Sequence, residues 1–315
     1  MSLPALQAIR GRFPKAHIAV LARPWVADLY AREPFADSVI LLTADRGTKD
    51  LGGVWRAAQA LRAERFDCAI LLQNAFEAAL IVWLAGIPRR IGYSRDGRGL
   101  LLTDSIRLPG AGEIPRHQRF YYLEMLRRAG ILVGDLPDAP IRLEKSAGAP
   151  ARIIGVSPGA AFGSAKRWPP GRFAEAAAEL ATKLDCTVAV FGSKDERELC
   201  EQVARLVEAR GLTARNFAGD TTLRDFIELV AGCLVYLTND SGGMHVACAL
   251  GVPTVAVFGP TDETATGPVG SWTRVVREPV ECSPCLLREC PTDHRCMERV
   301  AVRRVVAAAL DLVRL

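Results

Sequence analysis

Two patterns of hydrophobic residues alternate along the chain. Short runs rich in β-branched residues, typical of buried strands, are followed by longer stretches in which apolar residues recur with helical spacing. In the first half this pattern predicts strands over His17–Leu21, Val39–Leu42, Cys68–Leu72 and Arg89–Ile91, and helices over Leu3–Arg12, Gly53–Glu64, Phe76–Ala85 and Gln118–Ala129. Such alternation indicates a parallel sheet covered by helices.

The second half repeats the pattern. It predicts strands over Ile153–Ser157, Thr187–Phe191, Leu234–Leu237 and Thr254–Phe258, and helices over Pro169–Leu184, Asp195–Arg210, Leu223–Ala231, Met244–Leu250 and Val300–Val313. Between the halves, Leu143–Pro150 has the composition of a linker. Because 315 residues exceed what one core usually organises, we expect two α/β domains, residues 1–146 and 151–315, each a doubly wound sheet facing a shared cleft. The last helix is placed so that it can also pack back on the first domain.

Charge and hydropathy narrow the class of protein. The net charge of +5, from 40 basic and 35 acidic residues, is mild, and no dense basic block predicts a nucleic-acid partner. The longest apolar run, Ala78–Ile87, is shorter than the ~20 residues of a membrane span, and no signal peptide opens the sequence. We therefore expect a cytoplasmic protein. Its charge suits anionic substrates or an anionic membrane surface, and equally a basic surface kept for solubility.

The strongest candidate site lies where the strand ending at Leu237 meets the next helix. Ser241, Gly242 and Gly243 at the helix entrance allow backbone N–H groups to approach an anion, and the helix N-terminus adds partial positive charge. Asp240 can accept hydrogen bonds from sugar hydroxyls, and His245 can donate one to a phosphate. An ordinary capped strand–helix turn is the equal alternative.

A second loop, Ser157–Pro170, also connects a strand to a helix. Small residues, Ser157 and Gly159 among them, precede Lys166, which can place a point charge on a diphosphate. The loop has no Walker spacing, and the chain has no G-x-G-x-x-G fingerprint, which argues against a dinucleotide dehydrogenase. A third turn offers Asp195 and Glu196, which can hold ribose hydroxyls or cap the following helix. A solvated surface loop is the alternative for Lys166.

Cysteines and arginines supply two further candidates. Four of the nine cysteines cluster as Cys282, Cys285, Cys290 and Cys296, with metal-like spacing that fits no standard zinc ribbon. Reduced thiols that pack a loop are the favoured interpretation, and a structural metal the lesser one. In the first half, the Gly92–Gly99 loop carries Arg95 and Arg98, which can meet a phosphorylated acceptor or simply face solvent.

Several long runs resemble one protein family. The matching runs are Ser157–Pro170 (SPGAAFGSAKRWPP), Asn239–Pro260 (NDSGGMHVACALGVPTVAVFGP), Cys282–Met297, Leu21–Trp25 and Trp83–Tyr93. Together they resemble the bacterial ADP-heptose:lipopolysaccharide heptosyltransferases, in particular the heptosyltransferase II-like members. The resemblance extends over nearly the whole chain.

The resemblance implies a GT-B glycosyltransferase that is inverting, metal-independent and without a cofactor. It would transfer heptose from ADP-L-glycero-D-manno-heptose, held by the C-terminal domain, to a lipid A–Kdo–heptose acceptor held by the N-terminal domain. Such an enzyme would be a monomer in the cytoplasm, in transient contact with the inner face of the cytoplasmic membrane. Lys166 would neutralise the diphosphate, and Asp195 or Glu196 would bind the ribose. The remaining donor-loop residues would be Asp240, Ser241, Gly242, Gly243 and His245.

One feature departs from the family. Its proposed general base is an Asp in a Gly-Asp turn after the first strand, and the sequence here opens on the helix that follows, Leu3–Arg12. Strand and base are therefore expected upstream of Met1, and residues 1–315 alone are expected to show little turnover. Two alternatives stay open at this point: an ADP-sugar-binding protein with impaired catalysis, and a GT-B nucleotide-sugar epimerase.

Overall fold

The computed structural model describes residues 1–44, 50–138, 140–145 and 151–313. The chain forms two compact units, Met1–Ala139 and Pro140–Leu315. From Leu143, whose N–H donates to the carbonyl of Ala249 at 2.9 Å, the backbone is already tied to the second unit. The division therefore falls a few residues before the predicted linker, of which residues 146–150 lie outside the described part of the chain.

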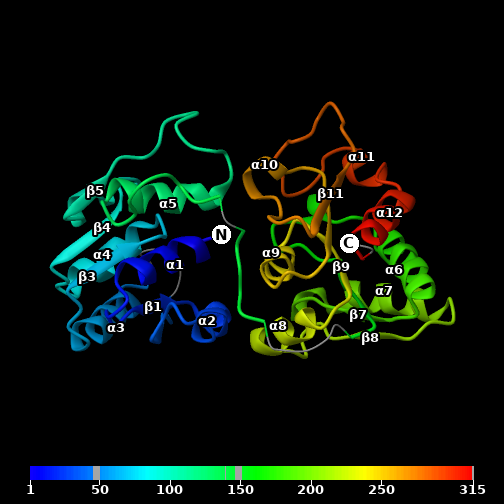
Figure 1. The fold of residues 1–315 in the computed structure, drawn as a ribbon, viewed down its shortest axis with the longest axis horizontal. Coiled ribbons are helices and arrows are strands. Elements are labelled where there is room, and N and C mark those ends of the chain that lie inside the picture. Colours follow the sequence, from blue (N-terminus) through cyan, green and yellow to red (C-terminus); the bar gives the residue numbers. More distant parts are fainter. Residues whose placement is uncertain (45–49, 139, 146–150, 314–315) are drawn as a thin grey trace. The chain divides into compact units, whose positions relative to one another are not determined.

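The first unit alternates helices and strands (Figure 1), and the sequence pattern predicts most of them but not the helix Pro24–Ala31 or the strand Asp104–Ile106. Its elements are α1 (Leu3–Arg12), β1 (Ala19–Ala22), α2 (Pro24–Ala31), β2 (Ser38–Leu41), α3 (Leu51–Ala63), β3 (Cys68–Leu71), α4 (Phe76–Leu84), β4 (Arg89–Tyr93), η1 (Arg98–Leu101), β5 (Asp104–Ile106) and α5 (Gln118–Arg128). The strands are parallel but form two ladders, β1–β2 and β3–β4–β5, because no described strand joins β1 to β3. Within the described residues, the strands of this unit therefore form two separate parallel sheets instead of the single doubly wound sheet that we expected.

Apolar faces of α3 and α4 build the core of this unit. Val54, Ala58 and Leu61 on α3 pack with Ile81 and other buried residues of α4 and the strands. Several large apolar side chains stay at the surface instead: Trp25, Trp55 and Trp83 are about half exposed.

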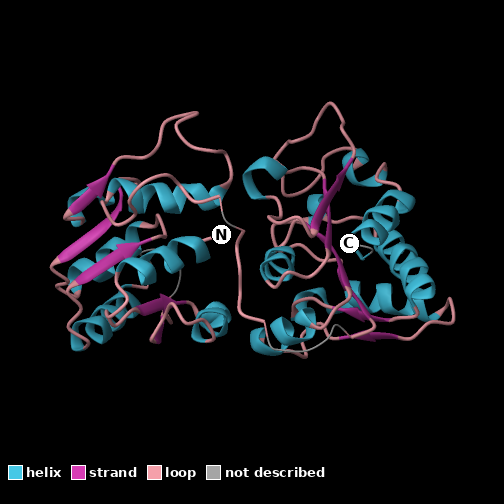
Figure 2. Cartoon of the chain, viewed as in Figure 1, coloured by secondary structure: helices cyan, strands magenta, loops and turns pink. Residues whose placement is uncertain are grey.

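The second unit contains one parallel sheet in the order β11-β10-β9-β6-β7-β8. Its elements are β6 (Ile153–Ser157), η2 (Ser164–Lys166), α6 (Pro170–Leu184), β7 (Thr187–Val190), η3 (Lys194–Glu196), α7 (Arg197–Glu208), β8 (Ala214–Asn216), α8 (Leu223–Ala231), β9 (Val235–Asn239), α9 (Gly242–Ala249), β10 (Thr254–Phe258), α10 (Glu263–Thr266), β11 (Thr273–Arg277), α11 (Arg295–Glu298) and α12 (Val302–Val313). Figure 2 shows helices gathered around these strands. β6, β9 and β10 are buried almost throughout, which explains why their sequences are mostly apolar.

Local sequence sets the ends of the helices that cover the sheet. α6 begins at Pro170, where a missing N–H costs no helical hydrogen bond, and ends at Leu184, before Asp185, which adopts a left-handed conformation with φ of 50°. The buried face of α12, with Val305, Val306 and Ala309, lies in the core of the second unit and packs against α6.

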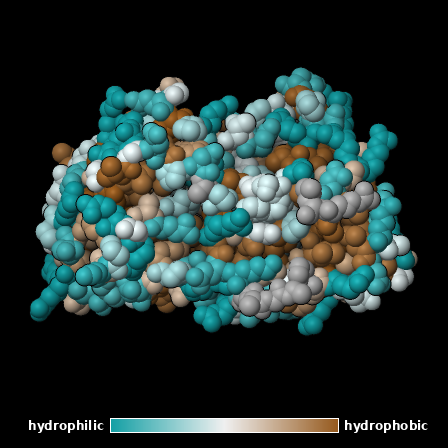
Figure 3. Space-filling model, viewed as in Figure 1, coloured by the Kyte–Doolittle hydropathy of each residue, from teal (hydrophilic) through white to brown (hydrophobic). Residues whose placement is uncertain are grey.

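Of the described helices, none has the length and apolar character needed to cross a membrane. Polar side chains cover much of the face drawn in Figure 3.

Candidate functional site

The sheet of the second unit has a switch point between β6 and β9. From β6 the chain proceeds through β7 and β8 to one edge, then returns to β9 and builds out through β10 and β11 to the other. In open α/β sheets, ligands bind outside the carboxyl ends of the strands at such a point. The loops that leave β6 and β9 here are the two that carry Lys166 and Asp240.

The structure joins these two side chains directly. Lys166 Nζ donates to Asp240 Oδ2 at 2.5 Å, and the side chains are only 12% and 6% exposed. Thr261, which follows β10, donates its hydroxyl to the same carboxylate oxygen at 2.7 Å. A buried ion pair requires such additional hydrogen bonds to offset desolvation. Loops after three adjacent strands therefore meet at the Asp240 carboxylate. Sequence reasoning missed Thr261, although its position at the carboxyl end of a neighbouring strand was a usable signal.

A second residue that sequence reasoning missed holds the Lys166 loop in place. Asn239 is fully buried; its Oδ1 accepts from the backbone N–H of Trp168 at 3.0 Å, and its Nδ2 donates to the carbonyl of Pro158 at 2.8 Å. The side chain of Trp168 is also fully buried and donates to the carbonyl of Val300 at 3.1 Å. Both ends of the loop are thereby fixed to the sheet and to the segment before α12.

The other predicted donor-loop residues lie around the start of α9. Ser241 caps this helix, since its Oγ accepts from the N–H of Met244 at 3.4 Å. Gly242 is exposed, while Gly243 and His245 are half-buried on the first turn. A Cβ on Gly243 would lie 3.0 Å from the Tyr236 hydroxyl, so the helix start approaches the sheet closely. The first N–H groups of a helix have no partner within it, and helix starts are therefore suited to binding anions.

Ser157 lies beside this turn, since a Cβ on Gly243 would be 3.4 Å from its Oγ. Its buried hydroxyl shares a hydrogen bond of 2.5 Å with the hydroxyl of Tyr236, so it ties the end of β6 to β9. Burial raises the pKa of Tyr236 well above its ordinary value. The Ser157 side chain is thus used inside the fold, in addition to any contact with a ligand.

The geometry separates the two acidic candidates after β7. Glu196 accepts from the N–H and hydroxyl of Ser193 at 2.9 and 3.1 Å, and it faces Gly159 so closely that a Cβ there would overlap its carboxylate. Asp195 is exposed. Glu196 is therefore the acid that joins the loops after β6 and β7, which favours it over Asp195 as the ribose partner.

The two arginines predicted to meet an acceptor have different surroundings. Arg95 is half exposed, with its Nε 3.6 Å from Asp96. Arg98 is fully buried, and it donates to the carbonyls of Tyr93 and Gln73 and to the side chain of Asn74. A left-handed turn at Gly97, with φ of 76°, directs Arg98 inward, and its burial lowers its pKa. This burial corrects the sequence expectation, because a guanidinium used in this way cannot also hold an acceptor phosphate.

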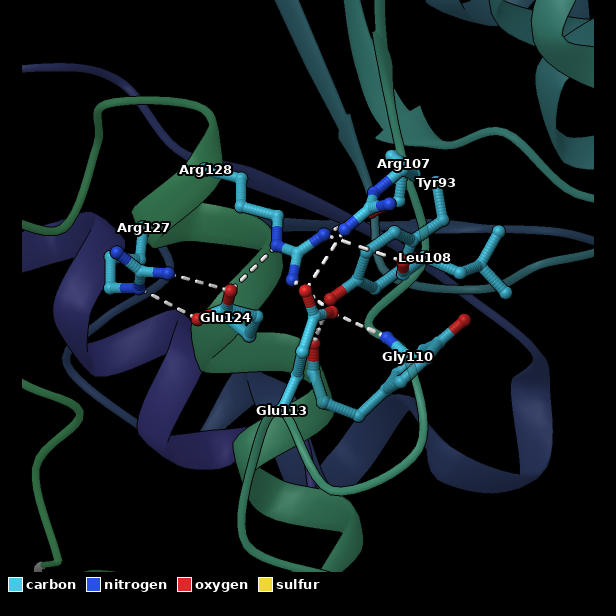
Figure 4. Close-up of polar contacts among 9 residues, drawn as sticks. Tyr93, Arg107, Leu108, Gly110, Glu113, Glu124, Arg127 and Arg128 are labelled. Atoms are coloured by element: carbon cyan, nitrogen blue, oxygen red, sulfur yellow. Dashed lines mark hydrogen bonds and ion pairs between the residues drawn. The ribbon is translucent and has the colours of Figure 1, made fainter.

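A network of ion pairs fixes the connection from β5 to α5 in the same unit (Figure 4). Glu124, with a side chain 2% exposed, accepts from both Arg127 and Arg128 at 2.6–2.8 Å. Arg128 also donates to Glu113 at 2.8 Å and to the carbonyl of Arg107 at 3.0 Å. The loop after β5 therefore has a defined position beside the helix rather than a free one.

The four clustered cysteines are all free thiols. Cys282 and Cys285 are exposed, Cys290 is half-buried and Cys296 is buried. Burial raises the pKa of Cys296 to about 11, and the three neighbouring cysteines act in the same direction. Within the part of the chain that the structure describes, no three His, Cys, Asp or Glu side chains form a group that could hold a metal ion. The structural metal considered from the spacing stays a prediction.

Comparison with known families decides the identity. The sequence model of glycosyltransferase family 9 (heptosyltransferase) matches residues 54–295. The chain belongs to glycosyltransferase family 9. The resemblance inferred from the motifs is therefore confirmed, and the protein is a glycosyltransferase.

Relatives of this family 9 glycosyltransferase include lipopolysaccharide heptosyltransferase 2 of Salmonella typhimurium, 34% identical over 292 residues that cover 88% of this chain and 84% of the relative. The Escherichia coli K12 protein of the same name is also 34% identical, with the same coverage. The solved structure of E. coli ADP-heptose lps heptosyltransferase II superposes with a TM-score of 0.81 at 29% identity, covering 99% of this chain and 94% of the other. These likenesses confirm the predicted GT-B α/β fold.

Proposed function

We propose that this glycosyltransferase transfers L-glycero-D-manno-heptose from ADP-heptose to the heptose of a lipid A–Kdo–heptose acceptor, in the assembly of the lipopolysaccharide inner core. The names of its 34% identical relatives support this substrate class. The observation that carries the proposal is the buried Lys166–Asp240 pair at the switch point of the second unit.

The donor half of the reaction follows from this pair. When the sugar nucleotide binds, Lys166 exchanges part of its contact with Asp240 for the diphosphate, and the start of α9 offers N–H groups to the same anion. Asp240, still held by Thr261, then accepts from sugar hydroxyls, and Glu196 accepts from the ribose. As the glycosidic bond breaks, negative charge grows on the departing ADP. Preorganised donors such as Lys166 stabilise that charge most strongly in the transition state.

The acceptor half is assigned to the first unit, where Arg95 is the exposed arginine of the loop after β4. We propose a cytoplasmic monomer that contacts the inner face of the cytoplasmic membrane transiently, since its acceptor is anchored there. The net charge of +5 favours approach to an anionic lipid surface.

The test is transfer by the full-length protein, with ADP-heptose and a heptosylated lipid A–Kdo acceptor, followed by mass spectrometry of the product. Lys166→Ala should lower kcat about 100-fold or more, as does loss of one preorganised donor to an oxyanion. Lys183→Ala, which removes a half-exposed lysine of α6, is the matched control and should leave the rate unchanged.

Three other results would contradict the proposal. Donor binding without product under any condition would indicate a binding protein. Donor consumption without acceptor would indicate an epimerase or hydrolase. Equal activity of Lys166→Ala and the wild type would remove Lys166 from the site.

A further inference from the structure

The loop between β11 and α11, residues 278–294, carries three of the clustered cysteines and none of the residues proposed above to bind the donor. It nevertheless contacts that site at two places. The N–H of Ala165 donates to the carbonyl of Arg288 at 3.0 Å, and the N–H of Leu286 donates to the carbonyl of Pro260 at 2.8 Å. The loop is therefore attached to the segments after both β6 and β10.

Two further features fix this attachment beside Lys166. His294, in a left-handed conformation with φ of 55°, donates from Nε2 to the carbonyl of Ala165 at 2.7 Å. Gly163 lies so close to the backbone of Arg288 that a Cβ would overlap its carbonyl oxygen. Ala165 thus has both its N–H and its carbonyl bonded to the loop, and Arg288 is held by its backbone next to the segment that carries Lys166.

The side chain of Arg288 shares a neighbour with Lys166. Lys166 Nζ lies 4.7 Å from the ring centroid of Phe162, and the guanidinium carbon of Arg288 lies 5.4 Å from the same centroid. Two cations therefore gather around one aromatic ring at the carboxyl edge of the sheet. Attraction to the ring face helps to hold both of them there.

Their electrostatic situations differ. The charge of Lys166 is largely offset by Asp240 at 2.5 Å. Arg288 is exposed, and among the described residues the structure gives it no ion pair with a carboxylate. A sugar-linked diphosphate carries negative charge on both phosphates, so Lys166 alone does not balance it. An arginine adds a planar fork of donors suited to two phosphate oxygens.

We propose that Arg288 is a second diphosphate-binding residue of the donor site, acting beside Lys166. This inference rests on the proposed function, because it deepens the same site. It assigns a purpose to the cysteine-containing loop, which forms a wall of the site and presents a cation from outside the two loops that the motifs reveal.

The test measures Kd for ADP and AMP by titration calorimetry with the full-length protein. Arg288→Gln should weaken ADP binding about 10-fold or more, the usual effect of losing a charged hydrogen bond. The Kd for AMP, which lacks the second phosphate, should change by less than about 3-fold in the same variant. Because the contact with Ala165 uses the Arg288 backbone, the substitution leaves the attachment of the loop intact.

Two variants complete the design. Arg288→Lys should recover part of the ADP affinity, since it keeps the charge but loses the fork. Arg303→Ala removes an exposed arginine of α12 and should change neither Kd. Unchanged ADP affinity in Arg288→Gln, or an equal loss for ADP and AMP, would overturn the inference. If the Arg288 inference fails in this way but Lys166→Ala still weakens ADP binding, the proposed function stands. If the wild-type protein binds no ADP, the proposed function itself fails.

Discussion

Asp240→Asn tests two roles of one carboxylate, the ion pair that the structure shows and the contact with the sugar that we propose. In the absence of donor, Asp240 neutralises Lys166; with donor bound, it is expected to hold the sugar. Asparagine keeps the size of the side chain and an oxygen that can accept from the Thr261 hydroxyl. The substitution therefore removes the charge and little else.

The magnitude follows from burial. Removing one partner of a buried ion pair lowers the free energy of unfolding by about 3–5 kcal/mol. Because asparagine retains an oxygen that accepts hydrogen bonds, we expect a smaller loss of about 1–3 kcal/mol. For a unit of this size we expect a decrease in Tm of about 2–4 °C per kcal/mol. Binding of ADP should become tighter, by up to about 10-fold, because Lys166 no longer has to leave a carboxylate to meet the diphosphate. ADP-heptose transfer should fall, because the charged carboxylate proposed to accept from the sugar hydroxyls is replaced by a neutral amide, which accepts more weakly.

The assay combines thermal denaturation, calorimetric titration with ADP and the transfer reaction. Asp311→Asn, at an exposed position of α12, serves as the control and should change none of the three. The reasoning would be refuted by a loss of ADP affinity in Asp240→Asn comparable to that in Lys166→Ala. Such a result would mean that Asp240 assists diphosphate binding instead of competing with it.

Two further predictions concern other carboxylates. Hydrogen bonds from Arg127 and Arg128 hold the pKa of Glu124 below its ordinary value, so its contribution to stability is present above the unfolded pKa of about 4.3 and is lost as pH falls through the lower, folded pKa. Glu124→Gln should therefore lower stability at neutral pH by about 1–3 kcal/mol and flatten the acid limb of the stability–pH curve, which urea unfolding at several pH values measures; an unchanged acid limb would contradict it. Glu196→Gln should raise KM for ADP-heptose about 10-fold with a smaller effect on kcat, whereas Asp195→Asn should not; steady-state kinetics that show the reverse order would reassign the ribose partner to Asp195.

The sequence predicted the α/β architecture because apolar, β-branched runs such as those of β6 and β10 alternate with stretches of helical periodicity, as in a parallel sheet covered by helices. The strands it missed are β5, β8 and β11. Their sequences mix polar and apolar residues, and two of them have three residues each, too few for a pattern to emerge. A short strand at a sheet edge is defined by its neighbour rather than by its own periodicity.

For the site, the loop positions were predictable and the directions of the side chains were not. Lys166 and Asp240 follow strands that the sequence identifies, and carboxyl ends of neighbouring parallel strands meet at one edge. Arg98 shows the limit: nothing in the loop composition distinguishes it from Arg95, yet it follows the left-handed turn at Gly97 and is fully buried. Burial of a charged side chain depends on acceptors such as the carbonyl of Gln73, which lies 25 residues away.

The same reasoning explains why the position of the Lys166 side chain could not be derived from the motif of its own loop. Between Gly163 and Trp168 the chain is held by Asn239 from β9, by Arg288 and His294 from the loop after β11, and by the carbonyl of Val300 before α12. These partners lie from 71 to 132 residues away from the positions that they fix. Small residues in the motif allow other segments to pack closely against the loop, but the position of Lys166 is set by those distant segments. A donor site built in this way should respond to substitutions in the β11–α11 loop even where they touch no ligand, because that loop bonds both the N–H and the carbonyl of the residue next to Lys166.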